Sequence, residues 1–233
     1  MPTTLHLLCA GAAQGLVKAL QARLLEDSDA LVAARFGAVG AMKEALLAGE
    51  PCDLLVSTEA MIGELAQAGW LRGETRAALG RVRTGVAVRR GAVHPDVATP
   101  AALKAALLAA DAIYFPDAVR STAGIHFAGV LRQLGIHDSL ASRLRTWPNG
   151  ATAMRELAAQ GTPMSIGCTQ VSEILYSDGI ELVGPLPQRF ELATVYSAAV
   201  TAKAAQPALA ARLLALLTGA QARGLRVAGG FED

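Results

Sequence analysis

Aromatic residues make up only 4% of this chain of 233 residues, whereas 52% of its residues are hydrophobic. A chain poor in aromatic rings but rich in Ala and Leu is expected to pack aliphatic helices on aliphatic strands. The formal net charge is only +1, and no cluster of Lys or Arg forms a basic patch. These properties argue against a nucleic-acid partner, so the expected partner is a small molecule.

Long apolar runs are also missing, since none approaches the roughly 20 residues needed to span a bilayer. We therefore expect no membrane insertion. Residues 1–10 contain no basic segment and become glycine-rich too early for a signal peptide. Leu7-Leu8-Cys9-Ala10 is similar to a lipoprotein cleavage site, but Leu8 stands where a small residue is required. The expected location is periplasmic if a leader has been removed, and cytoplasmic otherwise.

Cysteine and histidine are too scarce and too scattered to indicate redox or metal chemistry. Cys9, Cys52 and Cys168 are odd in number and form no Cys-x-x-Cys pair, so we expect them to pack as small hydrophobic residues. The histidines lack ligand spacing with any cysteine. They are His6, His94, His126 and His137. No metal and no cofactor are expected.

The most informative stretch is residues 113–126, where an apolar run stops at Pro116 and a helical pattern restarts near Ser121. A strand that enters a helix through Arg120, Ser121 and Thr122 would direct backbone N–H groups, hydroxyls and a guanidinium at one point. Such an arrangement suits an anion. The alternative is an ordinary strand-to-helix turn in which Ser121 is the N-cap.

Similar turns recur at the start of the chain. Apolar runs at residues 5–9, 31–36 and 53–57 are each followed by residues with helical spacing, and Thr58 is expected to cap the third helix. Strand–helix units that follow one another so closely predict a parallel sheet with helices on its faces.

The predicted elements differ in length and order in the second part of the chain. Residues 82–89 and 193–202 are expected to form two longer strands that bracket a block of shorter elements. Within this block, residues 112–115 and 164–167 are predicted strands, and residues 169–174 are predicted to form a short helix.

Two crossovers between two α/β lobes explain this bracket, whereas a single doubly wound sheet would not require it. The predicted lobes comprise residues 1–82 with 196–233, and residues 83–195.

Several segments together carry a family resemblance. They are Gly49-Glu-Pro-Cys-Asp-Leu-Leu-Val-Ser57, Arg89-Arg-Gly-Ala92, Thr99-Pro-Ala-Ala-Leu103, Gly124-Ile-His-Phe127, Leu131-x-x-Leu-Gly135, Gln170-Val-Ser-Glu-Ile174, Val183-Gly-Pro-Leu-Pro187 and Thr194-Val-Tyr-Ser-Ala-Ala-Val200. In this order they resemble the molybdate-binding-protein group of type 2 periplasmic solute-binding proteins, which also includes aconitate isomerase. The resemblance spans nearly the whole chain.

The resemblance implies two α/β lobes with a ligand cleft between them, a bound small anion, and delivery of that anion to an ABC permease. Hinge closure on the ligand would follow, because the two crossover strands are the joints. Together with Arg120 from the local analysis, it predicts a set of ligand-binding residues. They are Ala10, Gly11, Ala12, Gly37, Ala38, Val39, Arg120, Ser121, Thr122, Ala123, Ala151, Thr152, Thr169 and Gln170.

The first two predicted loops depart from the pattern of the group. Molybdate binders of this group carry a Ser in each, whereas residues 10–13 and 37–40 contain only Ala, Gly and Val here. Loss of two hydrogen bonds to a buried dianion costs several kcal/mol, at roughly 1.5–3 each. We therefore do not expect tight molybdate binding. The predicted ligand is a small anion, either another oxyanion or a larger organic carboxylate. Arg120 and Arg35 are candidate carboxylate contacts, with surface positions as the alternative.

Two functions remain open. The first is a solute-binding protein that performs no chemistry. The second is an aconitate-isomerase-like enzyme, in which Arg120 and nearby hydroxyls hold the carboxylates and an acid/base group moves an allylic proton. No catalytic residue is assigned, because His126 is expected to pack in a core and His6 and Glu173 are expected to be structural.

Overall fold

The computed structural model describes residues 3–28 and 30–233, and the chain folds into two compact units. Unit 1 comprises Met1–Arg81 and Thr194–Asp233, and unit 2 comprises Val82–Ala193. The chain passes from one unit to the other within strand β4 (Ala77–Arg89) and at the first residue of strand β9 (Ala193–Val200).

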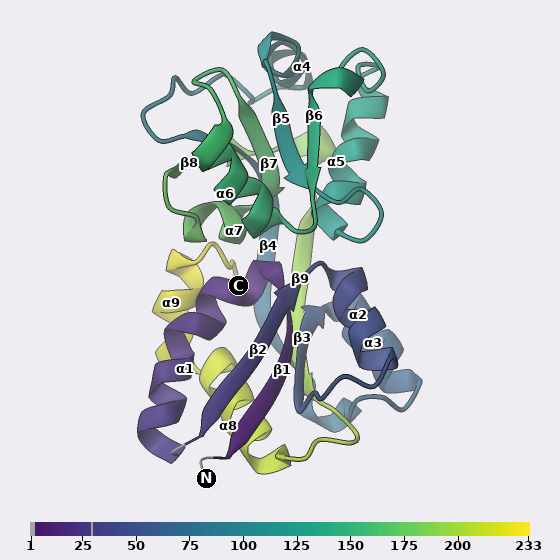
Figure 1. Cartoon of the computed structure of the whole chain (residues 1–233), viewed down its shortest axis with the longest axis vertical. Helices are drawn as coiled ribbons and strands as arrows, with labels where there is room; N and C mark the ends of the chain where they lie inside the picture. Colours follow the sequence, from purple (N-terminus) through teal and green to yellow (C-terminus); the bar gives the residue numbers. More distant parts are fainter. Residues whose placement is uncertain (1–2, 29) are drawn as a thin grey trace. The chain divides into compact units, whose positions relative to one another are not determined.

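Unit 1 is built on a parallel three-stranded core to which β9 adds an antiparallel strand, in the order β2-β1-β3-β9. Its elements are β1 (Thr4–Ala10), η1 (Gly11–Ala13), α1 (Gln14–Ser28), β2 (Leu31–Gly37), α2 (Val39–Leu47), β3 (Leu54–Thr58), α3 (Glu59–Gln67), η2 (Gly73–Thr75), α8 (Pro207–Thr218), η5 (Ala220–Ala222) and α9 (Arg223–Ala228). The predicted parallel sheet is confirmed. Helices α1, α8 and α9 lie on one face of it, and α2 and α3 lie on the other (Figure 1).

Unit 2 carries a mixed sheet in the order β8-β4-β7-β5-β6. Strand β5 is parallel to β6 and to β7, and β4 is antiparallel to β7 and to β8. The elements not yet defined are α4 (Pro100–Ala109), β5 (Ile113–Pro116), α5 (Thr122–Gln133), η3 (Ala141–Arg143), β6 (Leu144–Trp147), α6 (Gly150–Gln160), β7 (Ile166–Gln170), α7 (Val171–Tyr176), β8 (Ile180–Pro185) and η4 (Gln188–Phe190).

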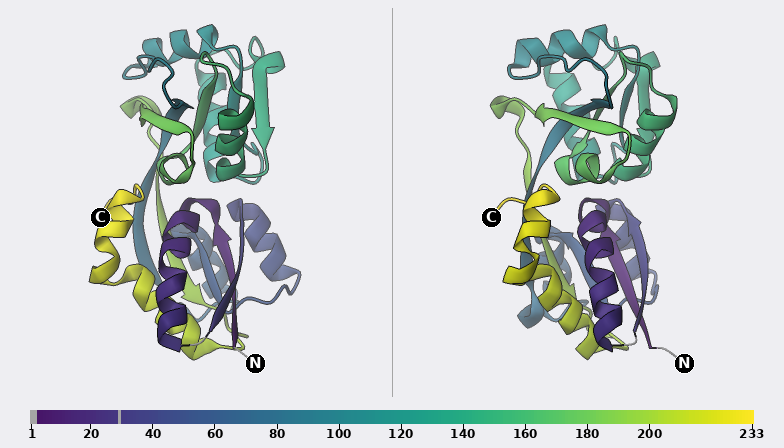
Figure 2. Two further views of the ribbon diagram at one scale, coloured as in Figure 1. Left: turned by 60° about the vertical axis from the view of Figure 1, so that its left-hand side comes forward. Right: turned by 90° about the vertical axis from the view of Figure 1, so that its left-hand side faces the viewer.

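Two aliphatic cores cover the two faces of the unit 2 sheet, with α4 and α5 on one face and α6 and α7 on the other (Figure 2). The α4/α5 core contains a pair of buried rings, Phe115 and Phe127, whose centroids lie 5.3 Å apart in edge-to-face geometry. This geometry stabilises the pair by about 0.5–1.5 kcal/mol beyond the burial of its area. The packing holds the first turn of α5 at the end of β5.

Two predicted boundaries are wrong in a way that affects the site. Strand β4 begins at Ala77 rather than at residue 82, and Leu79 in the added segment is buried. Strand β7 continues through Thr169 and Gln170, which were predicted to be helical. Hydrogen bonding to β4, with Gln170 opposite Thr84, extends this strand beyond what its short apolar run indicates.

Candidate anion-binding site

The candidate site in unit 2 lies where parallel strands end and helices begin. Strands β5, β6 and β7 run in the same direction, so their carboxyl ends meet at one edge of the sheet. Helices α5, α6 and α7 start within a few residues of these ends. Pro116 and Trp147, the last residues of β5 and β6, are direct partners in the sheet. The first turns of α5 and α6 therefore start from neighbouring strands.

Helix α5 starts without a side-chain cap. Ser121 occupies the N-cap position and is 8% exposed, but its hydroxyl makes no capping hydrogen bond. The prediction that Ser121 is an ordinary cap is therefore wrong. The loop is instead held by Asp117, whose Oδ1 accepts from the N–H groups of Val119 and Arg120 at 2.7 Å each. The first helical N–H groups, on Thr122 and Ala123, have no intrahelical acceptor, as in any α-helix.

The capping of α5 contrasts with that of α3 and α4, two helices that begin away from the predicted ligand loops, but α8 is uncapped as well. Thr58 accepts from the N–H of Met61 at 3.3 Å, and Thr99 accepts from the N–H of Ala102 at 3.1 Å. The Thr58 cap matches the sequence prediction. A side-chain cap typically stabilises a helix by about 1 kcal/mol, so an uncapped Ser at the start of α5 leaves donors available for a ligand.

Helix α6, the neighbour of α5, has its first turn occupied by the protein itself. Asn149 is the N-cap, and its Oδ1 accepts from the N–H of Thr152 at 2.8 Å. The carboxyl group of Glu173 accepts from the N–H groups of Gly150 and Ala151. It also accepts from the Thr169 hydroxyl, with 2.6 Å between Oγ1 and Oε2. A Cβ at position 150 would overlap both Oε2 of Glu173 and Oγ1 of Thr169, so only glycine fits there.

The structure thus brings Ala151, Thr152, Thr169 and Gln170 together as predicted, but it directs their polar groups inward. The N–H of Gln170 is a further donor to Glu173. With its amide turned so that both of its polar atoms are satisfied, the Gln170 side chain donates to the carbonyl oxygens of Val82 and Arg83, at 3.2 and 3.1 Å.

Glu173 is only 5% exposed, and burial raises the pKa of its carboxyl group against the opposing effect of its hydrogen bonds. The sequence indicated that Glu173 is structural, but it did not indicate that its carboxyl group contacts the first turn of α6.

The candidate loops of unit 1 show the same lack of side-chain caps as α5. Ala10 and Gly37 end β1 and β2 and are partners in the parallel sheet. Ala10 precedes η1 and Ala38 precedes α2, and neither makes a side-chain capping bond. A Cβ at position 37 would lie 2.7 Å from Cε of Met42, so the turn into α2 is narrow. Gly11, Ala12 and Val39 lie in these two turns.

A polar cluster at the end of β3 was missed by the sequence analysis. Glu59, the first residue of α3, accepts from the Ser197 hydroxyl and forms an ion pair with Arg76. Ser57 lies opposite Ser197 in the sheet and is 1% exposed, and its hydroxyl has no hydrogen-bond partner among the described residues. Ser57 and Glu59 follow a predicted strand and could have been noticed. Arg76 and Ser197 reach the cluster only through folding.

Both arginine candidates are exposed. Arg35 on β2 forms an ion pair with Glu50. Arg120 is exposed at the edge of the α5 turn. Among the other candidates, His126 bonds the carbonyl oxygen of Phe190 through Nε2 at 2.8 Å, in agreement with a packing role.

Cysteine and metal chemistry have no visible basis in the residues described. All three thiols are free, and Cys9 and Cys168 are fully buried. Burial raises the pKa of Cys52 to about 12. Within residues 3–28 and 30–233, no group of three or more His, Cys, Asp or Glu side chains is arranged to hold a metal ion. No helix in these ranges is long and apolar enough to cross a bilayer.

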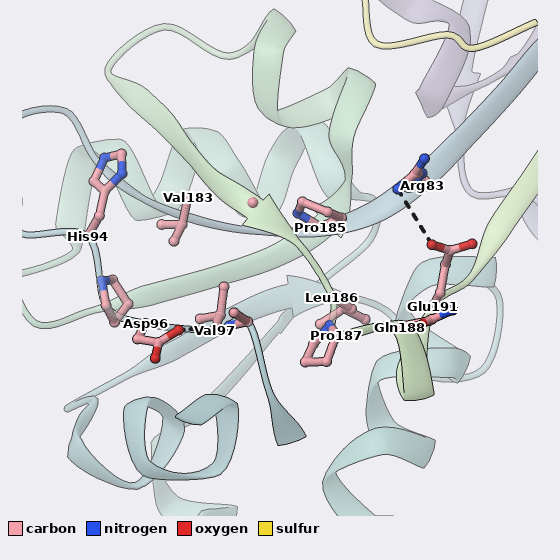
Figure 3. A pocket seen from close by; sticks show the side chains of 13 residues that line it. Arg83, His94, Asp96, Val97, Val183, Pro185, Leu186, Pro187, Gln188 and Glu191 are labelled. Carbon is pink, nitrogen blue, oxygen red and sulfur yellow. Dashed lines mark hydrogen bonds and ion pairs between the residues drawn. The ribbon is translucent and has the colours of Figure 1, made fainter. Parts of the chain in front are cut away.

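Unit 2 also contains a cavity of about 630 Å³ that the sequence did not predict. It lies beside β8 and the loop at residues 94–98, where Pro185, Leu186 and Pro187 form part of its wall (Figure 3). Its charged groups are largely paired, since Arg83 lies 3.5 Å from Glu191 and His94 lies 3.2 Å from Glu181. The cavity does not include any of the predicted ligand-binding residues.

The fold and the arrangement of its strand-to-helix turns are those of a solute-binding protein. The family model described as bacterial extracellular solute-binding protein matches residues 5–232. The chain belongs to this family.

Individual relatives include an enzyme and binding proteins. Aconitate isomerase from Pseudomonas sp is 28% identical over 183 residues, which cover 78% of this chain and 68% of that protein. The periplasmic molybdate-binding protein of Azotobacter vinelandii has a TM-score of 0.80 at 18% identity, over 98% of this chain and 99% of that one. The sulfate-binding protein SubI from Mycobacterium tuberculosis H37Rv has a TM-score of 0.72 at 17% identity, over 98% and 86%.

These similarities confirm the predicted group and the predicted two-lobed α/β fold of periplasmic binding proteins. At these identities the solved structures establish the fold alone.

Proposed function

We propose that this protein binds a small anion, with an organic carboxylate as the preferred class. The observation that carries the proposal is the capping pattern of the helices. The turns at Ala10, Ala38 and Ser121 have no side-chain cap, whereas α3 and α4 are capped by threonines and α6 by Asn149. Helix α8 also lacks a side-chain cap. An uncapped helical N-terminus offers N–H donors and a partial positive charge to an anion.

A carboxylate fits the composition of these turns better than a tetrahedral oxyanion does. The two turns of unit 1 carry Ala, Gly and Val side chains, so they offer backbone donors and space but no hydroxyls. Arg120, at the edge of the α5 turn, adds a guanidinium whose geometry matches a carboxylate. We therefore propose Arg120, Ser121, Thr122 and Ala123 as one carboxylate seat.

The family supports a transport role for this binding activity. Because the chain belongs to the family of bacterial extracellular solute-binding proteins, we propose an ABC permease as its partner and the periplasm as its location.

A second function is favoured by the similarity to aconitate isomerase over 78% of this chain. In that function the carboxylate seat at residues 120–123 would hold one carboxylate of a polycarboxylate, and an acid/base group would move an allylic proton. Of the two acidic side chains described above, Glu59 is the more accessible, because its side chain is 30% exposed at the end of β3. Glu173 is almost completely buried.

A thermal-shift screen tests the proposal directly, because a ligand that binds only the native state raises its stability. The panel contains molybdate, tungstate, sulfate, and di- and tricarboxylates that include cis- and trans-aconitate. A shift with a carboxylate is the expected result, and a panel without any response would refute anion binding. A compound that binds is then incubated with the protein and followed by NMR. Conversion of one aconitate isomer into another would establish the enzyme, whereas stable binding would establish the carrier.

A further inference from the structure

The carboxyl group of Glu173 lies against the first turn of helix α6. A Cβ at position 150 would lie 2.0 Å from Oε2 of Glu173. The Thr169 hydroxyl donates to the same oxygen, with 2.6 Å between Oγ1 and Oε2. The backbone N–H groups of Gly150, Ala151 and Gln170 act on the carboxyl as further donors that lower its pKa. Glu173 is only 5% exposed, so it is not a surface ion pair.

The donors of α6 are equally well accounted for. Gly150 and Ala151 donate to Glu173, Thr152 donates to the Asn149 side chain, and Ala153 donates to the Asn149 carbonyl oxygen at 3.0 Å. Helix α5 begins beside α6, from the adjacent parallel strand, and its N-cap Ser121 makes no side-chain capping bond. The N–H groups at the α6 terminus therefore have acceptors within the protein, whereas the neighbouring α5 terminus has no side-chain cap.

We propose that Glu173 determines ligand specificity by occupying the α6 terminus with the protein's own carboxyl group. This inference rests on the proposed anion-binding function. The α5 turn then accepts a single carboxylate of the ligand, and unit 2 rejects tetrahedral dianions such as molybdate, tungstate and sulfate. A tetrahedral dianion directs four oxygens and two charges at its surroundings, and it would find the neighbouring donors already taken.

Two physical features keep Glu173 in place when a ligand arrives. Displacement would leave the N–H groups of Gly150 and Ala151 without an acceptor, and it would move a buried carboxyl group through packed side chains. The overlap that any Cβ at position 150 would make shows that the carboxyl lies directly on the helix backbone.

The first experiment compares wild type with Glu173→Ala, and with Asp138→Ala as a control. Asp138 lies in the same unit with a fully exposed side chain, so its removal changes the net charge by the same amount without opening a helix terminus. Molybdate, sulfate and the carboxylate panel are titrated into each protein by calorimetry. We expect Glu173→Ala to bind molybdate or sulfate at least tenfold more tightly than wild type and Asp138→Ala do.

The second experiment tests occupancy of the α6 terminus without any knowledge of the ligand. Formate is added to Glu173→Ala, to Glu173→Gln and to wild type at an ionic strength held constant with NaCl. Formate should refill the space vacated in Glu173→Ala and raise its Tm by about 2–4 °C, which corresponds to roughly 1 kcal/mol for a protein of this size. Wild type and the nearly isosteric Glu173→Gln should respond less.

The outcomes separate this inference from the proposed function. Wild type that binds molybdate as tightly as Glu173→Ala would overturn the role of Glu173 while leaving anion binding intact. An absence of response to every anion in wild type and in both charge variants would refute the proposed function. If Glu173→Ala does not fold, formate added during refolding is expected to restore it, and a failure of formate to affect refolding or Tm would overturn occupancy of the terminus.

Discussion

A glycine inside helix α5 provides a sharp test of how the candidate seat is built. Gly124 is buried in the first turn of α5, and a Cβ at this position would overlap the carbonyl oxygens of Pro116 and Asp117. Gly129 lies later in the same helix, and a Cβ there would meet nothing within 4 Å. The same substitution to alanine should therefore have opposite effects at the two positions.

The magnitudes follow from two competing contributions. Alanine is favoured over glycine in a helix by roughly 0.5–1 kcal/mol, and Gly129→Ala should gain about this amount. Gly124→Ala gains the same propensity but must displace backbone atoms, at a cost of about 1–3 kcal/mol. The carbonyl oxygens cannot move aside as a flexible side chain would. We expect a net loss of about 1–2 kcal/mol, or a Tm lower by roughly 2–8 °C.

Thermal and urea unfolding, followed by circular dichroism, measure the stability of both variants. Anion affinity is measured alongside, because displacement of the first turn should weaken binding in Gly124→Ala and leave Gly129→Ala unchanged. Equal stabilisation by the two substitutions would show that the close approach at Gly124 is absent. In that case our description of the α5 turn would be wrong.

Three further predictions concern individual side chains. Arg120→Ala should weaken carboxylate binding at least tenfold in calorimetry, and unaltered affinity would remove Arg120 from the seat. Thr99→Ala removes the cap of α4 and should cost about 1 kcal/mol of unfolding free energy; since α4 lies outside the seat, a change in ligand affinity would contradict this assignment. The pKa of Glu173 is raised above its ordinary value of 4.5, so the native state holds a proton that the unfolded state releases. The free energy of unfolding should then fall as the pH rises above 4.5. Glu173→Gln should reduce this slope, and an identical pH profile in the variant would disprove the raised pKa.

Much of the architecture could be read from local patterns in the chain. Short apolar runs, each followed by residues with helical spacing, located the parallel strands of unit 1. Buried strands and amphipathic helices each produce their own pattern of apolar residues. Thr58 was recognised as a cap because an N-cap bond forms within a single turn. The ordered set of segments also identified the family. All these features depend on residues that are close in sequence.

The polar contacts of the candidate site were decided by tertiary structure. Ser121 has the sequence of a cap but does not act as one, because Asp117 holds its loop in a different way. Glu173 reaches the first turn of α6 only because β7 lies beside β5 and returns the chain to that edge of the sheet. Local sequence can thus show which donors and acceptors a turn offers. Which of them a distant residue already occupies depends on long-range packing, and this occupancy determines which groups remain for a ligand.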